Sequence, residues 1–282
     1  MSQINFNGNT LTLQCKQLNK IVGSETFNGS LFLLPKDCRL TELTLEGISN
    51  IQGDFQCKDY FYVKKFVMPF IRVAGNMTIA LNSGSVNTEA EIEFPNLLEI
   101  GGTLTLENNK NANNITFPSL KKILGSCSVT TSHLKNDIEF TNLESIGTDG
   151  ANAQIKFEID GTNILCPKLK TINGKFDITT STVIFDMEAD QVSYPNVESI
   201  SENLSITCPY SDFGSNGILS IDFSGLKSVK GISISGQGDV TDFSSFKYLF
   251  ENNVLTGESQ WSVRECAYNP TYQDMKNGKY KQ

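Results

Sequence analysis

Apolar residues recur along this chain in a pattern that repeats about every 23 residues. In the clearest copy, the apolar positions are Phe94, Leu97, Ile100, Leu104 and Leu106. A proline follows the first of them, and a glycine stands two residues before Leu104. The segment from Phe117 to Val129 repeats this skeleton 23 residues later, and about nine or ten copies with small insertions and deletions cover most of the chain. A repeat of this length is typical of solenoid proteins.

The spacing within one copy predicts its local structure. Leu104 and Leu106 alternate with polar residues, which indicates a strand with one buried face, and Ile92 and Phe94 indicate a second short strand. Gly102 suits a corner that requires a positive φ or a close approach of two backbones. The segment from Leu97 to Ile100 is too short for a helix, so it is either a 3₁₀ turn or an extended corner. Each copy is therefore expected to form one coil of a solenoid.

One such coil cannot bury enough apolar surface to fold alone, so neighbouring coils must stack. The sequence predicts a mainly β protein with a single solenoid of about nine to ten coils. Residues 1–40 are expected to form an N-terminal cap with a first irregular coil, and residues 41–240 the repeats. Residues 241–282 are expected to form a C-terminal cap with two short helices, one carrying Phe243, Phe246, Leu249 and Phe250 and one spanning Pro270 to Lys276. The pattern fixes neither the hand of the coil nor the number of sheets.

The skeleton in which Leu104, Leu106 and Asn109 follow Leu-x-x-Ile-x-Gly resembles the leucine-rich-repeat relatives known as receptor L domains. It is also similar to repeat-bearing cell-surface lipoproteins of Bacteroides-type gut bacteria, and the ending from Trp261 to Tyr280 resembles the tail of such proteins. The resemblance covers about residues 40–282. It implies a coil similar to a right-handed β-helix, an extracellular location at a bacterial cell surface, and binding of proteins or glycans.

The first residues depart from that family, because Met1 to Asn5 show no basic stretch followed by an apolar one and no lipobox cysteine. Two interpretations stay open: the protein is cytosolic, or it is a mature domain whose signal peptide or lipid anchor lies upstream of this start. No apolar run reaches the ~18–20 residues of a membrane helix, so no transmembrane segment is expected. The chain has 23 Lys and Arg against 31 Asp and Glu, a net charge of −8, which argues against nucleic acid as a partner.

The seven cysteines fit a structural interpretation better than a chemical one. Cys57, Cys127 and Cys208 lie on strand alternations, and Cys166 replaces the phenylalanine before proline, so all four are expected in the core. Cys15 and Cys38 are candidates for a disulfide near the N-terminal cap, and Cys266 is expected to be buried in the C-terminal cap. No Cys-x-x-Cys motif occurs, so the sequence supports neither a zinc site nor a redox motif.

Catalytic and metal-binding patterns are weak, and we expect no enzyme, no cofactor and no bound metal. The positions expected to face outward on the strands are mostly serine and threonine, with Lys175 and Asp177 as exceptions. The densest acidic cluster is Asp186, Glu188 and Asp190, which lacks the glycine of a calcium-binding loop and is read as a solvated insertion. The single histidine, His133, lies in a polar segment and is read as a surface residue.

Binding is the function that the pattern favours. Solenoids bind ligands through an extended face or through insertions at one coil corner. Aromatic side chains suit sugar rings and protein hot spots, although they also pack beneath their own loops. The candidate binding residues are Tyr60 and Tyr62, which alternate and so share a face, and Phe185, Tyr210 and Phe213, which lie in predicted insertions. A Thr-x-Thr array also suggests ice binding, but the wandering repeat length argues against it.

The sequence thus leads to the hypothesis of a non-enzymatic cell-surface binding or adhesion module that recognises a host protein or polysaccharide. The alternative is a structural subunit of an extracellular or viral assembly, in which a regular face serves packing.

Overall fold

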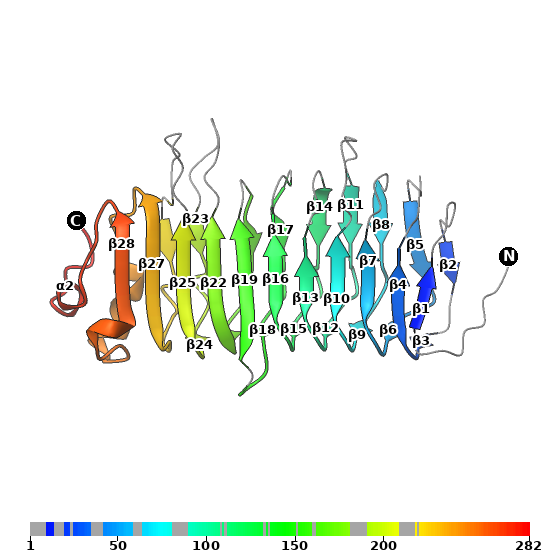
Figure 1. Ribbon diagram of the computed structural model, residues 1–282, viewed down its shortest axis with the longest axis horizontal. Coiled ribbons are helices and arrows are strands. Elements are labelled where there is room, and N and C mark those ends of the chain that lie inside the picture. The colour runs from blue at the N-terminus through cyan, green and yellow to red at the C-terminus, as the bar shows by residue number, and fades with distance from the viewer. Residues whose placement is uncertain are drawn as a thin grey trace.

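The computed structural model describes residues 10–13, 20–22, 25–34, 42–58, 64–80, 90–107, 109, 112–131, 134, 136–150, 152–159, 162–180, 191–208, 218 and 220–282. In these residues the chain forms a parallel β-solenoid, with strands stacked side by side from the N-terminal to the C-terminal end (Figure 1). The predicted mainly β solenoid with short C-terminal helices is confirmed. The structure adds the number of long sheets, which is three among the described residues.

Sheet A is the longest of the three and has eleven strands. They are β1 (Thr10–Leu13), β4 (Ser30–Leu33), β7 (Phe55–Lys58), β10 (Met77–Ala80), β13 (Leu104–Leu106), β16 (Cys127–Thr130), β19 (Ala153–Ile159), β22 (Gly174–Thr180), β25 (Asn203–Cys208), β27 (Gly231–Gly238) and β28 (Trp261–Cys266).

Sheet B has seven strands and sheet C has eight. Sheet B consists of β2 (Lys20–Val22), β5 (Glu42–Glu46), β8 (Lys65–Val67), β11 (Ala90–Glu93), β14 (Ala112–Thr116), β17 (Ile138–Glu139) and β20 (Ile164–Leu165). Sheet C consists of β3 (Thr26–Phe27), β6 (Asn50–Ile51), β9 (Arg72–Val73), β12 (Glu99–Ile100), β15 (Lys122–Ile123), β18 (Ser145–Ile146), β21 (Thr171–Ile172) and β24 (Ser199–Ile200).

One coil runs from a strand of sheet A through sheet B to sheet C and then enters sheet A again. Seven such turns, from β1 to β21, contribute a strand to all three sheets. The two coils that follow continue differently, since β23 (Gln191–Ser193) and β26 (Ser220–Asp222) pair only with each other among the described strands. In place of a ninth strand in sheet C, Ser228 forms a single parallel bridge to Ser199.

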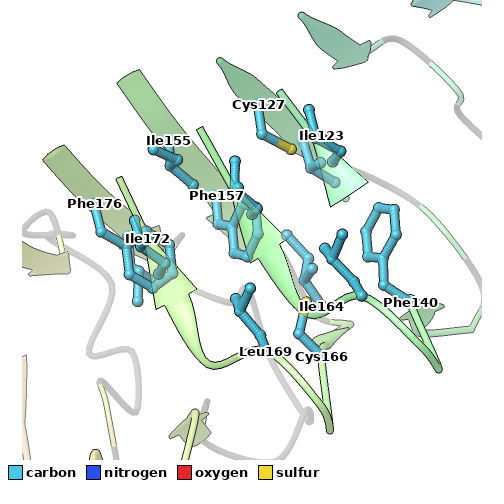
Figure 2. Close-up of a cluster of buried hydrophobic side chains, with 14 of the residues drawn as sticks. Ile123, Cys127, Phe140, Ile155, Phe157, Ile164, Cys166, Leu169, Ile172 and Phe176 are labelled. Carbon is cyan, nitrogen blue, oxygen red and sulfur yellow. The ribbon is translucent and has the colours of Figure 1, made fainter. Parts of the chain in front are cut away.

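Stacked aromatic rings fill the interior next to sheet B. Phe94, Phe117 and Phe140 hold the same repeat position in three successive coils, and the ring centroids of Phe94 and Phe117 are 4.9 Å apart, those of Phe117 and Phe140 5.0 Å. The next coil has Cys166 at this position. Phe157 and Phe176 from sheet A point into the same interior and contact each other and Tyr194, so aromatic volume lost at the cysteine is supplied from the opposite wall (Figure 2).

The predicted core cysteines are confirmed, because Cys57, Cys127, Cys166 and Cys208 are all buried. Burial raises the pKa of the Cys127 and Cys166 thiols, which keeps them protonated and inert. Cys266 is only partly buried, contrary to expectation, because it lies at the end of edge strand β28. Cys15 and Cys38 lie outside the described residues.

Glycines stack where sheet C leads into sheet A. The N–H of Gly53, Gly75, Gly102 and Gly125 each donates to a glycine carbonyl one coil earlier, at 2.9–3.0 Å. None of these four has a positive φ. A Cβ on Gly102 would lie 2.8 Å from the carbonyl carbon and oxygen of Gly75, so the close approach of two backbones is what requires glycine here.

Charges of alternating sign follow the corner between sheets B and C. One residue per coil donates its N–H to the carbonyl of its counterpart in the preceding coil, at 2.8–3.0 Å along the row that runs from Leu98 to Lys227. The side chains in this row are Leu98, Lys121, Glu144, Lys170, Glu198 and Lys227. Lys227 and Glu198 form an ion pair with a separation of 3.1 Å. Alternation therefore places opposite charges on neighbouring coils.

The C-terminal end of the core is closed by η1 (Ser244–Phe246), α1 (Lys247–Glu251), η2 (Glu258–Gln260) and α2 (Tyr272–Lys276). The ring of Trp261 packs against Phe243, Phe246 and Phe250, and its indole N–H donates to the carbonyl of Pro270 at 2.9 Å. The second predicted helix begins slightly later than expected, because Thr271 caps it by accepting from the N–H of Asp274. No helix in the described ranges is long and apolar enough to cross a membrane.

We expect Gly102→Ala to lower the free energy of unfolding by about 1–3 kcal/mol, because the added methyl group forces two stacked backbones apart. Gly257→Ala is the matched control, since a Cβ there meets nothing closer than 3.9 Å. Urea unfolding of both variants measures the difference, and equal stabilities would show that the glycine stack is not tightly packed.

We expect Glu198→Lys to destabilise the protein by roughly 0.5–1 kcal/mol more than Glu198→Gln, since it places three lysines on successive coils. The difference should shrink at high salt, because these side chains are partly exposed and screened. Thermal unfolding at low and high ionic strength checks this, and a difference independent of salt would rule out charge alternation as its cause.

Candidate functional site

The five predicted binding residues all lie outside the described residues, so the structure places the strands on either side of them. Tyr60 and Tyr62 fall between β7 and β8, and Phe185 falls between β22 and β23. Tyr210 and Phe213 fall between β25 and β26. In every case the strand before the segment belongs to sheet A, and the strand after it starts the next side of the coil. The five residues therefore belong to one corner, which we call the A–B edge.

Connections at the A–B edge differ in length far more than those at the other two corners. They range from four residues between Ile159 and Ile164 to eleven residues between Cys208 and Ser220. From β11 onward, every connection from sheet B to sheet C has five residues, as between Glu93 and Glu99. Connections from sheet C to sheet A have at most six, between Ile146 and Ala153. Variation in length is thus concentrated at one edge of the solenoid.

Buried polar side chains line the described part of this edge. The amide of Asn109 donates to the carbonyl of Ile79 at 3.0 Å, and the hydroxyl of Thr131 lies 3.2 Å from the carbonyl of Thr162. These bonds satisfy backbone carbonyls where the chain leaves sheet A. Among the described residues, the buried hydroxyls of Thr162 and Thr180 have no hydrogen-bond partner. Sequence reasoning identified Asn109 only as part of a motif and missed the three threonines, because nothing in the repeat marks them as inward-facing.

The outward face of sheet A is polar, as the alternation predicted. Strand pairing aligns Thr78, Thr105 and Ser128 in one row, and Ser205, Ser233 and Ser262 continue it beyond β22. Among the described residues, this face carries hydroxyl groups toward both ends. Charged groups are concentrated in the middle, on β19 and β22.

Those charged groups are Lys156 and Glu158 on β19 and Lys175 and Asp177 on β22, which we call the central cluster. Lys156 pairs with Glu158 at 2.5 Å, and Lys175 pairs with Asp177 at 2.9 Å. Thr130 donates to Glu158 at 2.8 Å. The hydrogen bond from Lys156 is the main cause that lowers the pKa of Glu158. A general acid at neutral pH requires a raised carboxyl pKa, so this cluster is poorly suited to acid catalysis.

Candidate metal ligands do not gather in the part of the chain that the structure describes. There, no three or more His, Cys, Asp or Glu side chains lie close enough to hold an ion. Asp186, Glu188, Asp190 and His133 lie outside that part. The chemistry available in the described residues is hydrogen bonding by hydroxyls and pairing of charges on sheet A.

Comparison of the chain with models of protein families, with curated proteins and with solved structures finds no match in any of the three. The function must therefore be argued from the residues and the geometry of this chain.

Proposed function

We propose that this protein is a non-enzymatic binding module, displayed at a bacterial cell surface, that recognises a host protein or glycan through its A–B edge. One observation carries the proposal. All five candidate aromatic residues fall in connections of the edge whose connections vary most in length. Variable segments on a rigid scaffold are where binding residues concentrate in proteins.

The other two corners are poorly suited to this role, since inter-coil contacts occupy them. At the corner between sheets C and A, glycine backbones are in contact, and Asp54 and Asn76 accept hydrogen bonds from the next coil. At the corner between sheets B and C, Asn142 and Asn196 donate to carbonyls of the preceding coil. Longer segments at these two corners would break the contacts between coils, whereas the A–B edge accommodates longer segments.

The cell-surface location and the relationship to leucine-rich-repeat proteins are part of this proposal, and both rest on the repeat motif. The buried Asn109 supports the resemblance to leucine-rich repeats, because its amide donates to the carbonyl of Ile79 on the preceding coil. Within the motif, the side chain of this asparagine therefore joins successive coils by a hydrogen bond.

The alternative is a structural subunit of an extracellular or viral assembly in which a regular face serves packing, and the end-to-end form of such an assembly is less well supported. Assembly of solenoids end to end requires open terminal coils. At the C-terminal end, α1, α2 and the ring of Trp261 cover the core instead. Capping of this kind suits a module that remains a discrete rod.

We expect the purified chain to bind saturably on an array of host matrix proteins, mucins and polysaccharides. The double substitution Tyr60→Ala and Tyr62→Ala should weaken that binding about tenfold or more, because aromatic side chains contribute strongly to recognition. Tyr248→Ala is the matched control, since Tyr248 is an exposed tyrosine in the C-terminal cap. An empty array, or binding equally weakened in both variants, would overturn the proposal.

A further inference from the structure

The central cluster has a symmetry that the fold does not require. Lys156 on β19 and Asp177 on β22 are direct neighbours in register, as are Gln154 and Lys175. The third such pair is Glu158 and Thr179. Each row therefore sets a charged group on one strand beside an opposite charge or a neutral polar group on the other. Such a surface is complementary to its own image after exchange of the two strands.

We propose that two copies of this chain dimerise through the outward faces of sheet A, about a two-fold axis that lies parallel to the strands between β19 and β22. The axis sets β19 of one copy against β22 of the other. Lys156 then faces Asp177 of the second copy, and the same pair forms again on the other side of the axis. Glu158 faces Thr179, and Lys175 faces Gln154, so each of the four charged groups meets an opposite charge or a hydrogen-bonding group.

The rows beyond the cluster fit the same axis. β16 faces β25, which places Ser128 opposite Ser205, and β13 faces β27, which places Thr105 opposite Ser233. β10 faces β28, with Thr78 opposite Ser262. In this row small hydroxyl side chains meet small hydroxyl side chains, while the long side chain of Arg264 on β28 lies in the next row, at the end of the overlap. The partly buried Phe32 on β4 lies outside the overlap.

The orientation follows from the charges. A two-fold axis perpendicular to the strands can set Lys156 opposite Glu158, but it then sets Asp177 opposite Thr179. Only one of the two charged strands finds a counterion in that arrangement. The side chains of the cluster remain available for an intermolecular contact, because Lys156 is 52% exposed and Asp177 28% exposed despite their pairs within the chain.

The overlap is large enough for a specific but modest contact. It includes eight strands of sheet A, which lie side by side in Figure 1. At about 4.8 Å per strand and about 3.3 Å per residue, it covers roughly 600 Å² per copy. That is at the low end of specific interfaces, which bury about 1,200–2,000 Å² in total. The dimer is therefore weak, and salt weakens it further because its centre is ionic.

The axis has a consequence for binding that rests on the proposed function. Because it is parallel to the strands, the carboxyl ends of sheet A point the same way in both copies. The two A–B edges then lie on the same side of the dimer. Two sites presented in one direction bind a repeating or surface-bound ligand with avidity, so the effective affinity exceeds that of one copy.

Analytical ultracentrifugation of the full chain at low salt tests the dimer without any ligand. We expect a mass of about twice 31.1 kDa, which falls toward the monomer as salt is raised. Lys156→Glu and Asp177→Lys should each be monomeric, since each sets like charges opposite one another twice. An equimolar mixture of the two variants should form a heterodimer, because every like-charged pair then becomes an opposite pair. Lys247→Glu on α1 is the control with the same change of charge and should remain dimeric.

Several outcomes overturn the inference. They are a monomeric wild type, a dimer that survives Lys156→Glu, and a mixture that stays monomeric while both variants keep the wild-type circular dichroism. A dimer that survives Asp177→Lys alone would indicate the perpendicular axis. A monomeric wild type whose array binding is lost in Lys156→Glu would assign this face to an external ligand. If the protein binds nothing on the ligand array, only the avidity argument is lost, because the mass measurement does not depend on a ligand.

Discussion

Stacking of one coil on the next at the spacing of hydrogen-bonded strands is the constraint on which this structure depends. Each corner residue binds its counterpart one coil earlier, as Gly102 binds Gly75 and Glu144 binds Lys121. The same translation brings like side chains together, so phenylalanines stack on phenylalanines and polar residues form rows. A residue is therefore selected for its contacts with its counterparts in adjacent coils as much as for its own coil. The repeat in the sequence follows from that requirement.

The same constraint separates the scaffold from the part that can vary. Two corners carry contacts between coils in nearly every turn, which restricts their length and residue types. The third corner, the A–B edge, accepts connections of four to eleven residues after the strands of sheet A. Its buried polar groups, such as Asn109 and Thr131, hold the backbone where the strands end. A rigid rod with a variable edge is the physical basis of the binding function that we propose.

Much of the fold could be predicted from the sequence, because Leu104 and Leu106 alternate over a regular period and Cys166 takes the place of a phenylalanine. The number of sheets could not, since strands of sheet C such as Glu99–Ile100 are too short to show alternation. The row of charges from Lys121 to Lys227 becomes visible only when coils are aligned in space. The candidate site was predicted by residue type alone. Tyr60, Tyr62, Phe185, Tyr210 and Phe213 share an edge because of the topology, which no local pattern reveals.

Coil stacking holds this fold together, and the A–B connections are free to vary in length. The most direct test replaces residues 181–190 with the four-residue connection found between Ile159 and Ile164. The quantity to measure is the free energy of unfolding of this variant. Loop-closure entropy changes slowly with length, so we expect a value within about 1 kcal/mol of the wild type. A decrease in the free energy of unfolding by several kcal/mol would contradict this expectation, because it would show that this connection helps to hold the coils together.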